Sequence, residues 1–261
     1  MTVAQPGLHH AEPAAQHTEM PLLDHLRELR NRVVVCAGAV VLGSLVCFLI
    51  WERILGWLLA PGRVDHPELK VVSFSPTDRI GVVFKIGMYG GLALASPIII
   101  YELLAFIVPG LTTRERRMIL PTVASTFAFL LSGMAFAYWI VLPKSLGFLL
   151  SFGSGTIENQ IGIDSYLSFV LKSIFWTGLS FELPIVMAII AWVGIATWRQ
   201  MLKFWRYAIV LILILACFVV PTPDPVDQGI VAVPLFGLYL LGIALARIFG
   251  KRRPKAEVPS V

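Results

Sequence analysis

Charged residues are scarce in this sequence: they make up 14% of its 261 residues, whereas 57% are hydrophobic. A typical soluble domain is about one quarter charged, so this composition excludes an ordinary soluble globular protein as well as a disordered one. The apolar residues also come in runs too long for buried core helices, which predicts a polytopic membrane protein. In such a protein the net charge of +5 mainly indicates how the chain is oriented in the membrane. Nucleic acid is not an expected partner.

Histidine, a frequent catalytic residue, is rare in this sequence and lies outside the apolar runs. All five histidines lie at or before position 66, and the sequence contains no H-E-x-x-H, G-x-S-x-G or Walker A motif. An intramembrane protease would need a catalytic histidine or a G-x-G-D motif, and the sequence offers neither in its apolar runs. The three cysteines, Cys36, Cys47 and Cys217, are interpreted as small core residues. We therefore expect no enzyme, no cofactor and no metal site.

Six apolar segments predict six transmembrane helices. They lie at about 33–50, 79–107, 118–142, 166–193, 206–220 and 229–246. The last two are short, because fifteen residues of helix span about 22 Å against a hydrocarbon core of about 30 Å, a mismatch that favours local thinning of the bilayer or close packing against longer neighbours. The predicted domains are a disordered tail at 1–20, a six-helix transmembrane domain at 21–248 and a basic tail at 249–261.

The basic residues indicate how this all-α integral membrane protein is oriented. Most fall on the side of the N-terminus, before the first span, in the second-to-third and fourth-to-fifth loops and after the sixth span: Arg27, Arg30, Arg32, Arg114, Arg116, Arg117, Arg199, Lys203, Arg206, Arg247, Lys251, Arg252, Arg253 and Lys255. The positive-inside rule then places both termini in the cytoplasm. The loops at about 51–78 and 143–165 face outward, with the clearest chain breaks at Pro61-Gly62 and Gly153-Ser154-Gly155.

Several motifs occur in a fixed order along the chain. They are His25-Leu-Arg-Glu-Leu-Arg30, Tyr101-Glu-Leu-Leu-Ala-Phe-Ile-Val-Pro-Gly-Leu111, Arg114-Glu-Arg-Arg117, Met134-Ala-Phe-Ala-Tyr138, Tyr166-Leu-Ser-Phe169 and Ser180-Phe-Glu-Leu-Pro184. Together they resemble the TatC family, the multispanning core of the twin-arginine protein translocase. The chain departs from the family at Glu102-Leu-Leu104, where members often have Gln-x-Trp, and at Asp78-Arg79-Ile80, where they often have Glu-Pro-Phe.

The resemblance implies a fold and a function. TatC proteins have six spans with both termini inside, which agrees with the orientation derived above. The resemblance implies a receptor for folded precursors that carry twin-arginine signal peptides, working with the single-span proteins TatA and TatB in homo- and hetero-oligomers of the cytoplasmic membrane. Transport in the family is driven by the proton-motive force.

Two carboxylates on the predicted cytoplasmic face are candidates for binding the signal peptide. Glu28 and Glu115 each lie among arginines, and a pair of neighbouring guanidinium groups needs two carboxylates held apart on a rigid frame. From the residues alone, Glu28 can equally form an i,i+4 pair with Arg32, and Glu115 can simply balance its neighbours. The resemblance favours signal-peptide contact, with Arg30 in the same motif. Phe106 would pack on the peptide's apolar stretch or serve as span packing.

Glu182, near the middle of the fourth span, is the second candidate site. A charge at that depth costs at least about 2.5–3.5 kcal/mol, so an intramembrane glutamate is a functional candidate. Ser180 lies on its polar side of the helix, and Pro184 removes the donor for the carbonyl of Ser180. The opposite arc is apolar and is expected to face lipid. Three interpretations of Glu182 remain: an internally hydrogen-bonded acid, a polar contact for TatA or TatB, and a proton relay.

The remaining polar positions suggest an alternative function. Lys85 lies within the second span, where it would snorkel outward or neutralise an acidic neighbour. Lys85, Lys172 and Glu182 could instead serve a proton-coupled small-molecule transporter, which would move solute when reconstituted alone. Pro61 and Asp224 mark the outward loops, and Asp224 in its tight turn is either a turn former or a functional acid.

Overall fold

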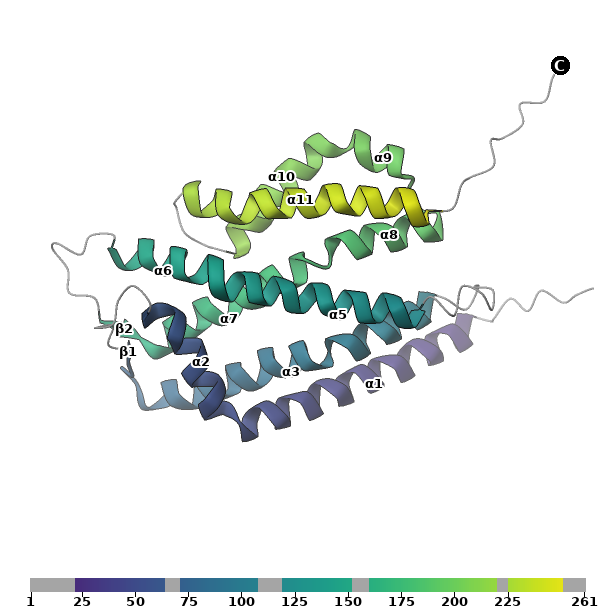
Figure 1. The fold of residues 1–261 in the computed structure, drawn as a ribbon. Helices are drawn as coiled ribbons and strands as arrows, with labels where there is room; N and C mark the ends of the chain where they lie inside the picture. The colour runs from purple at the N-terminus through teal and green to yellow at the C-terminus, as the bar shows by residue number, and fades with distance from the viewer. Residues whose placement is uncertain (1–21, 64–70, 108–118, 152–159, 220–224, 251–261) are drawn as a thin grey trace, which may run out of the picture.

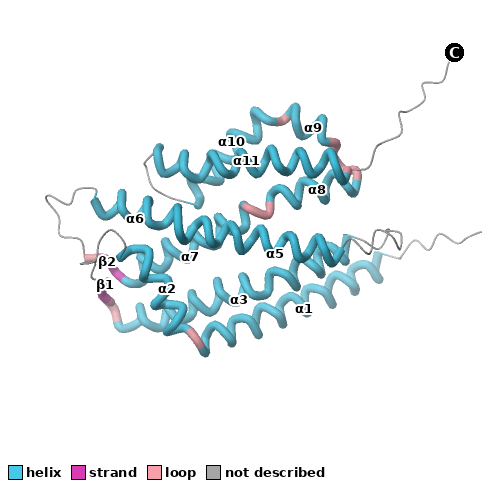
Figure 2. The backbone as a smooth tube through the Cα atoms, viewed as in Figure 1, coloured by secondary structure: helices cyan, strands magenta, loops and turns pink. Residues whose placement is uncertain are grey.

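The computed structural model describes residues 22–63, 71–107, 119–151, 160–219 and 225–250. In these ranges the chain forms a bundle whose long helices lie roughly along one axis, some pointing one way and some the other, with a small sheet at one end (Figures 1 and 2). The start of α1 and the end of α11 lie at the same end of the bundle, and α2 and the two strands lie at the opposite end (Figure 1).

The elements follow one another as a nearly continuous series of helices. In chain order they are α1 (Leu22–Leu49), α2 (Trp51–Arg63), β1 (Val71–Val72), α3 (Pro76–Ile107), α5 (Ile119–Phe136), the π-helical turn η1 (Ala137–Val141), α6 (Leu142–Ser151), β2 (Ile161–Gly162), α7 (Ile163–Ser180), α8 (Leu183–Val193), α9 (Trp198–Lys203), α10 (Trp205–Val219) and α11 (Pro225–Phe249). The strands β1 and β2 pair in parallel, Val71 with Ile161 and Val72 with Gly162.

Within the described residues, five stretches are long and apolar enough to cross a membrane. They are Leu26–Leu49, Pro76–Phe106, Leu120–Ser151, Ile163–Val193 and Gln228–Phe249, and α10 is a shorter apolar helix of 15 residues. The predicted short fifth helix is therefore confirmed, whereas the prediction of a short sixth one is wrong. With 25 residues, α11 is about 37 Å long, because the helix begins at Pro225, before the apolar run does.

The predicted outward loop at 51–78 contains a helix, and Pro61 does not break it. Pro61 is buried in the last turn of α2. A proline lacks the N–H that would bond to the carbonyl four residues earlier. That carbonyl, of Trp57, accepts a hydrogen bond of 2.9 Å from the hydroxyl of Tyr138, and the next one, of Leu58, accepts one of 3.1 Å from Tyr166. Two tyrosines of the family-like motifs thus fix α2 to the bundle.

The fourth span, predicted as one helix, is divided in two near Pro184. Helix α7 ends at Ser180, and α8 begins at Leu183 with Pro184 in its first turn. The expectation that the apolar arc of this span faces lipid is wrong. All of its members except the partly buried Phe181 are buried in the protein core, and Leu167 and Val170 have no exposed surface. The reason is that α7 is packed against α3, α5 and α10, so that it has protein on several sides.

Candidate functional site

Helices α1 and α3 pack closely because glycines let their backbones approach. A Cβ atom on Gly43 would lie 2.8 Å from the carbonyl oxygen of Gly91, and one on Gly91 would lie 2.6 Å from the backbone nitrogen of Ser44. Neither position can therefore carry a larger side chain without moving the helices. Arg32 precedes Gly43 by the same eleven residues by which Glu102 follows Gly91. In an antiparallel pair this register places Arg32 beside Glu102, about 16 Å along the axes from the glycine contact.

Arg32 joins two carboxylates from different helices. Its Nη1 donates to Oε2 of Glu102 on α3 at 2.8 Å, while its Nε and Nη2 donate to Oε1 of Glu28 on α1 at 3.2 and 2.5 Å. The side chains of Glu28, Arg32 and Glu102 are 27%, 23% and 16% exposed, so the cluster is partly shielded but can be reached from outside. We refer to these three residues as the carboxylate cluster. It lies towards the end of the bundle where α1 begins and α3 ends.

The structure describes three of the four residues predicted to bind the peptide, Glu28, Arg30 and Phe106. Glu28 forms the i,i+4 pair with Arg32 that the sequence allowed. Arg30 is exposed, and its Nη2 donates to the side-chain oxygen of Asn31 at 3.2 Å rather than to the cluster. Phe106 is partly buried on α3, one helical turn after Glu102. Glu115 lies outside the described residues.

Sequence reasoning missed Glu102 as a site residue. It was noted only as a departure from the family pattern. A signal was nevertheless present, because a carboxylate near the end of an apolar span needs a partner, and Arg32 near the start of another span needs one too. What the sequence could not supply was the register between the two helices that pairs them.

Glu182 lies at the break in the fourth span. It immediately precedes α8, is 9% exposed, and its carbonyl accepts the backbone N–H groups of Ile185 and Val186. Ser180, predicted to lie with it, is also buried, and its hydroxyl donates to the carbonyl of Trp176 at 2.6 Å. The carboxyl group of Glu182 makes no capping hydrogen bond to the start of α8.

Lys85 neutralises an acidic neighbour, one of the two roles expected for it. Its Nζ lies 2.5 Å from Oδ1 of Asp164, at the start of α7, and 2.8 Å from Oγ of Ser168. Ser168 in turn donates to the carbonyl of Asp164 at 2.7 Å. This cluster ties the early part of α3 to the start of α7, beside the small sheet. Asp224, the other predicted residue of the outward side, lies outside the described residues.

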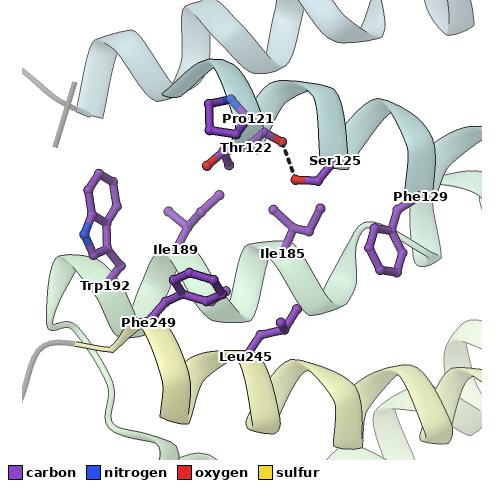
Figure 3. A pocket seen from close by; sticks show the side chains of 10 residues that line it. Pro121, Thr122, Ser125, Phe129, Ile185, Ile189, Trp192, Leu245 and Phe249 are labelled. Atoms are coloured by element: carbon purple, nitrogen blue, oxygen red, sulfur yellow. Dashed lines mark hydrogen bonds between the residues drawn. The ribbon is translucent and has the colours of Figure 1, made fainter. Parts of the chain in front are cut away.

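An apolar pocket opens between α5, α8 and α11 (Figure 3). It has a volume of about 290 Å³. The hydroxyl of Ser125, in its wall, is already bonded to the carbonyl of Thr122 at 2.8 Å, as Figure 3 shows. Neither Lys85 nor Glu182 lines it. The pocket suits an apolar group and lacks the convergent polar groups of a site for a polar solute. Its lining residues are Pro121, Thr122, Ser125, Phe129, Ile185, Ala188, Ile189, Trp192, Leu245 and Phe249.

Comparison with known families decides the classification. The model of the family described as "Sec-independent protein translocase protein (TatC)" matches residues 24–234. The chain belongs to the TatC family. It is therefore a component of a protein translocase, and its apolar helices make it a multi-pass membrane protein.

Members of the TatC family from distant organisms align over most of the chain. The Sec-independent protein translocase protein TatC of Synechocystis sp. is 36% identical over 251 residues, covering 96% of this chain and 97% of its own. The TatC of Aquifex aeolicus is 33% identical over 240 residues, covering 91% and 99%. The chloroplastic TATC of Arabidopsis thaliana is 38% identical over 233 residues, covering 89% of this chain and 68% of its own.

The fold agrees with a solved TatC structure. A crystal structure described as "Twin Arginine Translocase Receptor- TatC" superposes with a TM-score of 0.75 at 34% sequence identity, covering 86% of this chain and 99% of the other. The same receptor crystallised in DDM gives a TM-score of 0.77. The likeness therefore extends over nearly the whole solved chain.

Proposed function

We propose that this chain is the receptor of a twin-arginine translocase. It binds the twin-arginine signal peptides of folded precursors at its cytoplasmic face through Glu28 and Glu115, and it nucleates assembly with TatA and TatB. The chain crosses the cytoplasmic membrane six times with both termini in the cytoplasm, and export is driven by the proton-motive force. The name of the solved relative, a twin-arginine translocase receptor, supports this assignment.

One observation carries the peptide-binding part of the proposal. Glu28 accepts two N–H groups of one guanidinium, that of Arg32, on a single carboxylate oxygen. The chain thus contains, within itself, the kind of contact that an arginine of a signal peptide requires. A lysine presents a compact ammonium without this planar fork, so replacing arginine by lysine in the ligand removes the geometry that the carboxylate accepts.

The path of the bound peptide follows from the elements around the carboxylate cluster. Phe106, one turn beyond Glu102, and the exposed apolar residues of α1 offer a surface to the peptide's hydrophobic stretch. Glu182 then provides a polar contact for TatA or TatB beside the divided fourth span. The 15-residue α10 is about 22 Å long and thins the bilayer near that contact.

Site-directed photo-crosslinking tests the proposed position of the peptide. A photoreactive side chain placed at Asn31, exposed beside the cluster, is expected to capture a labelled Arg-Arg signal peptide. The matched control is the same probe at Trp57, which is 73% exposed at the other end of the bundle. Equal labelling from both positions, or labelling by a Lys-Lys peptide at the same level, would overturn the assignment.

The transporter alternative predicts a different result. A proton-coupled transporter would move small solutes when reconstituted alone, whereas the receptor needs its single-span partners. Lys85, which that alternative requires, is already neutralised by Asp164. Solute uptake by vesicles that contain only this chain would favour the transporter.

A further inference from the structure

The guanidinium of Arg32 fills Oε1 of Glu28, one of the two carboxylate oxygens available to an incoming arginine. Its Nε and Nη2 donate hydrogen bonds to Glu28, while its Nη1 donates one to Glu102. The carboxylate of Glu28 is therefore partly occupied before a ligand binds, since Oε1 already accepts two hydrogen bonds from Arg32. A ligand that binds Glu28 through the same fork must first displace Arg32 from it.

Displacing Arg32 would be costly if no second partner were present. A charged side chain that is 23% exposed and lies in an apolar helix is strongly disfavoured without a counter-charge. Glu102 supplies that counter-charge from the opposite helix, through a different nitrogen of the same guanidinium. Arg32 can therefore leave Glu28 without losing its contact to Glu102.

The two carboxylates also differ in how accessible they are. Glu28 is 27% exposed and Glu102 is 16% exposed, so a ligand arriving from outside reaches Glu28 first. The glycine contact between α1 and α3 fixes the distance between the helices, which keeps Glu102 within reach of Arg32 throughout the exchange.

We propose that Arg32 is a built-in competitor for Glu28, and that Glu102 retains Arg32 when an arginine of the ligand takes its place on Glu28. This inference rests on the proposed function, because it concerns the same peptide site. It makes Glu102 a positioning residue that acts through Arg32. The exchange also raises selectivity, because a ligand lysine cannot reproduce the two-donor contact that it would have to replace.

A double-mutant cycle tests the exchange. The affinity of a labelled Arg-Arg signal peptide is measured for the full-length protein in detergent and for the variants Arg32→Gln, Glu102→Gln and the double change. Removing the competitor is expected to tighten binding by about tenfold. Glu102→Gln is expected to weaken binding by about tenfold, because Arg32 then holds Glu28 alone. In the Arg32→Gln background, Glu102→Gln is expected to change nothing.

Any other outcome would contradict the proposed exchange of Arg32 for an arginine of the ligand. If Glu102→Gln weakens binding equally in both backgrounds, Glu102 contacts the peptide directly. If Arg32→Gln weakens binding, Arg32 supports the site instead of competing for it. Should Arg32→Gln fail to fold, Arg32→Lys replaces it in the cycle, since a lysine keeps the charge but cannot span both carboxylates with a planar fork. Failure of the proposed function is recognised separately, because the unaltered protein would then not prefer Arg-Arg over Lys-Lys peptide.

Discussion

Arg32 on α1 and Glu102 on α3 form an ion pair, with 2.8 Å between Nη1 and Oε2, across two helices whose register is set by a contact between Gly43 and Gly91. The chemistry at one end of the helix pair thus depends on backbone packing about three turns away. A change that separates the glycines is expected to disturb the carboxylate cluster without touching any of its residues.

Gly91→Ala tests this dependence. The new Cβ would meet the backbone of Ser44 at 2.6 Å, a contact that no side-chain rotation relieves, so the helices must move apart. We expect the free energy of unfolding to fall by about 1–3 kcal/mol, measured by thermal unfolding in detergent. Gly38→Ala is the matched control on α1, because its Cβ would meet nothing within 4 Å. Equal stability of the two variants would contradict the proposed register.

The pairing of Lys85 with Asp164 predicts a non-additive effect on stability. Lys85→Met alone leaves Asp164 without its cation, which is expected to cost about 1 kcal/mol, because the two side chains are 29% and 42% exposed. Adding Asp164→Leu removes the orphaned charge, so the double variant should be more stable than Lys85→Met. Lys144→Met, at an exposed position of α6, controls for the loss of a lysine as such. Additive losses in the double variant would mean that the two residues act independently.

Glu182 is expected to matter for transport and not for peptide affinity. Glu182→Ala should reduce transport of a twin-arginine precursor into vesicles that contain TatA and TatB, while the affinity for the peptide stays within about twofold. Glu182→Gln retains the hydrogen-bonding shape without the charge, so it separates a polar contact, which it would preserve, from a proton relay, which it would abolish. Val186→Ala, at an exposed position of α8, serves as the control.

A loss of peptide binding in a folded Glu182→Ala protein would show that the two sites are not separate. Normal transport by that variant would remove Glu182 from the mechanism altogether. Folding is checked in each case by the thermal unfolding of the detergent-purified protein.

The sequence predicted the apolar segments well, because hydrophobic composition is what membrane insertion selects. It was wrong about α11, since a helix continues into polar residues that a hydrophobicity scan leaves out. It also misread Pro61, because the carbonyl that this proline leaves unbonded is satisfied by Tyr138, a residue far away in the sequence. Local patterns identify a proline but cannot supply the donor that compensates for it.

The candidate site was predicted in part for a similar reason. Glu28 and its i,i+4 partner Arg32 share one helix, so their pairing follows from spacing alone. Glu102 and Asp164 were not predicted as the partners of Arg32 and Lys85, because both pairings cross between helices. The prediction that the apolar arc of α7 faces lipid was wrong for the same reason. A helical wheel shows which residues share a face of a helix, but not which neighbouring helices cover that face.

Binding of a labelled signal peptide to the purified protein tests the receptor assignment most directly. The affinities of an Arg-Arg peptide and its Lys-Lys counterpart are compared in the unaltered protein, in the Glu28→Gln/Glu115→Gln variant, and in Glu52→Gln, an exposed control at the other end of the bundle. We predict that the unaltered protein and the control prefer Arg-Arg by at least about tenfold, and that the double variant loses this preference. A folded protein that binds both peptides equally, or a double variant that keeps the preference, would contradict the account.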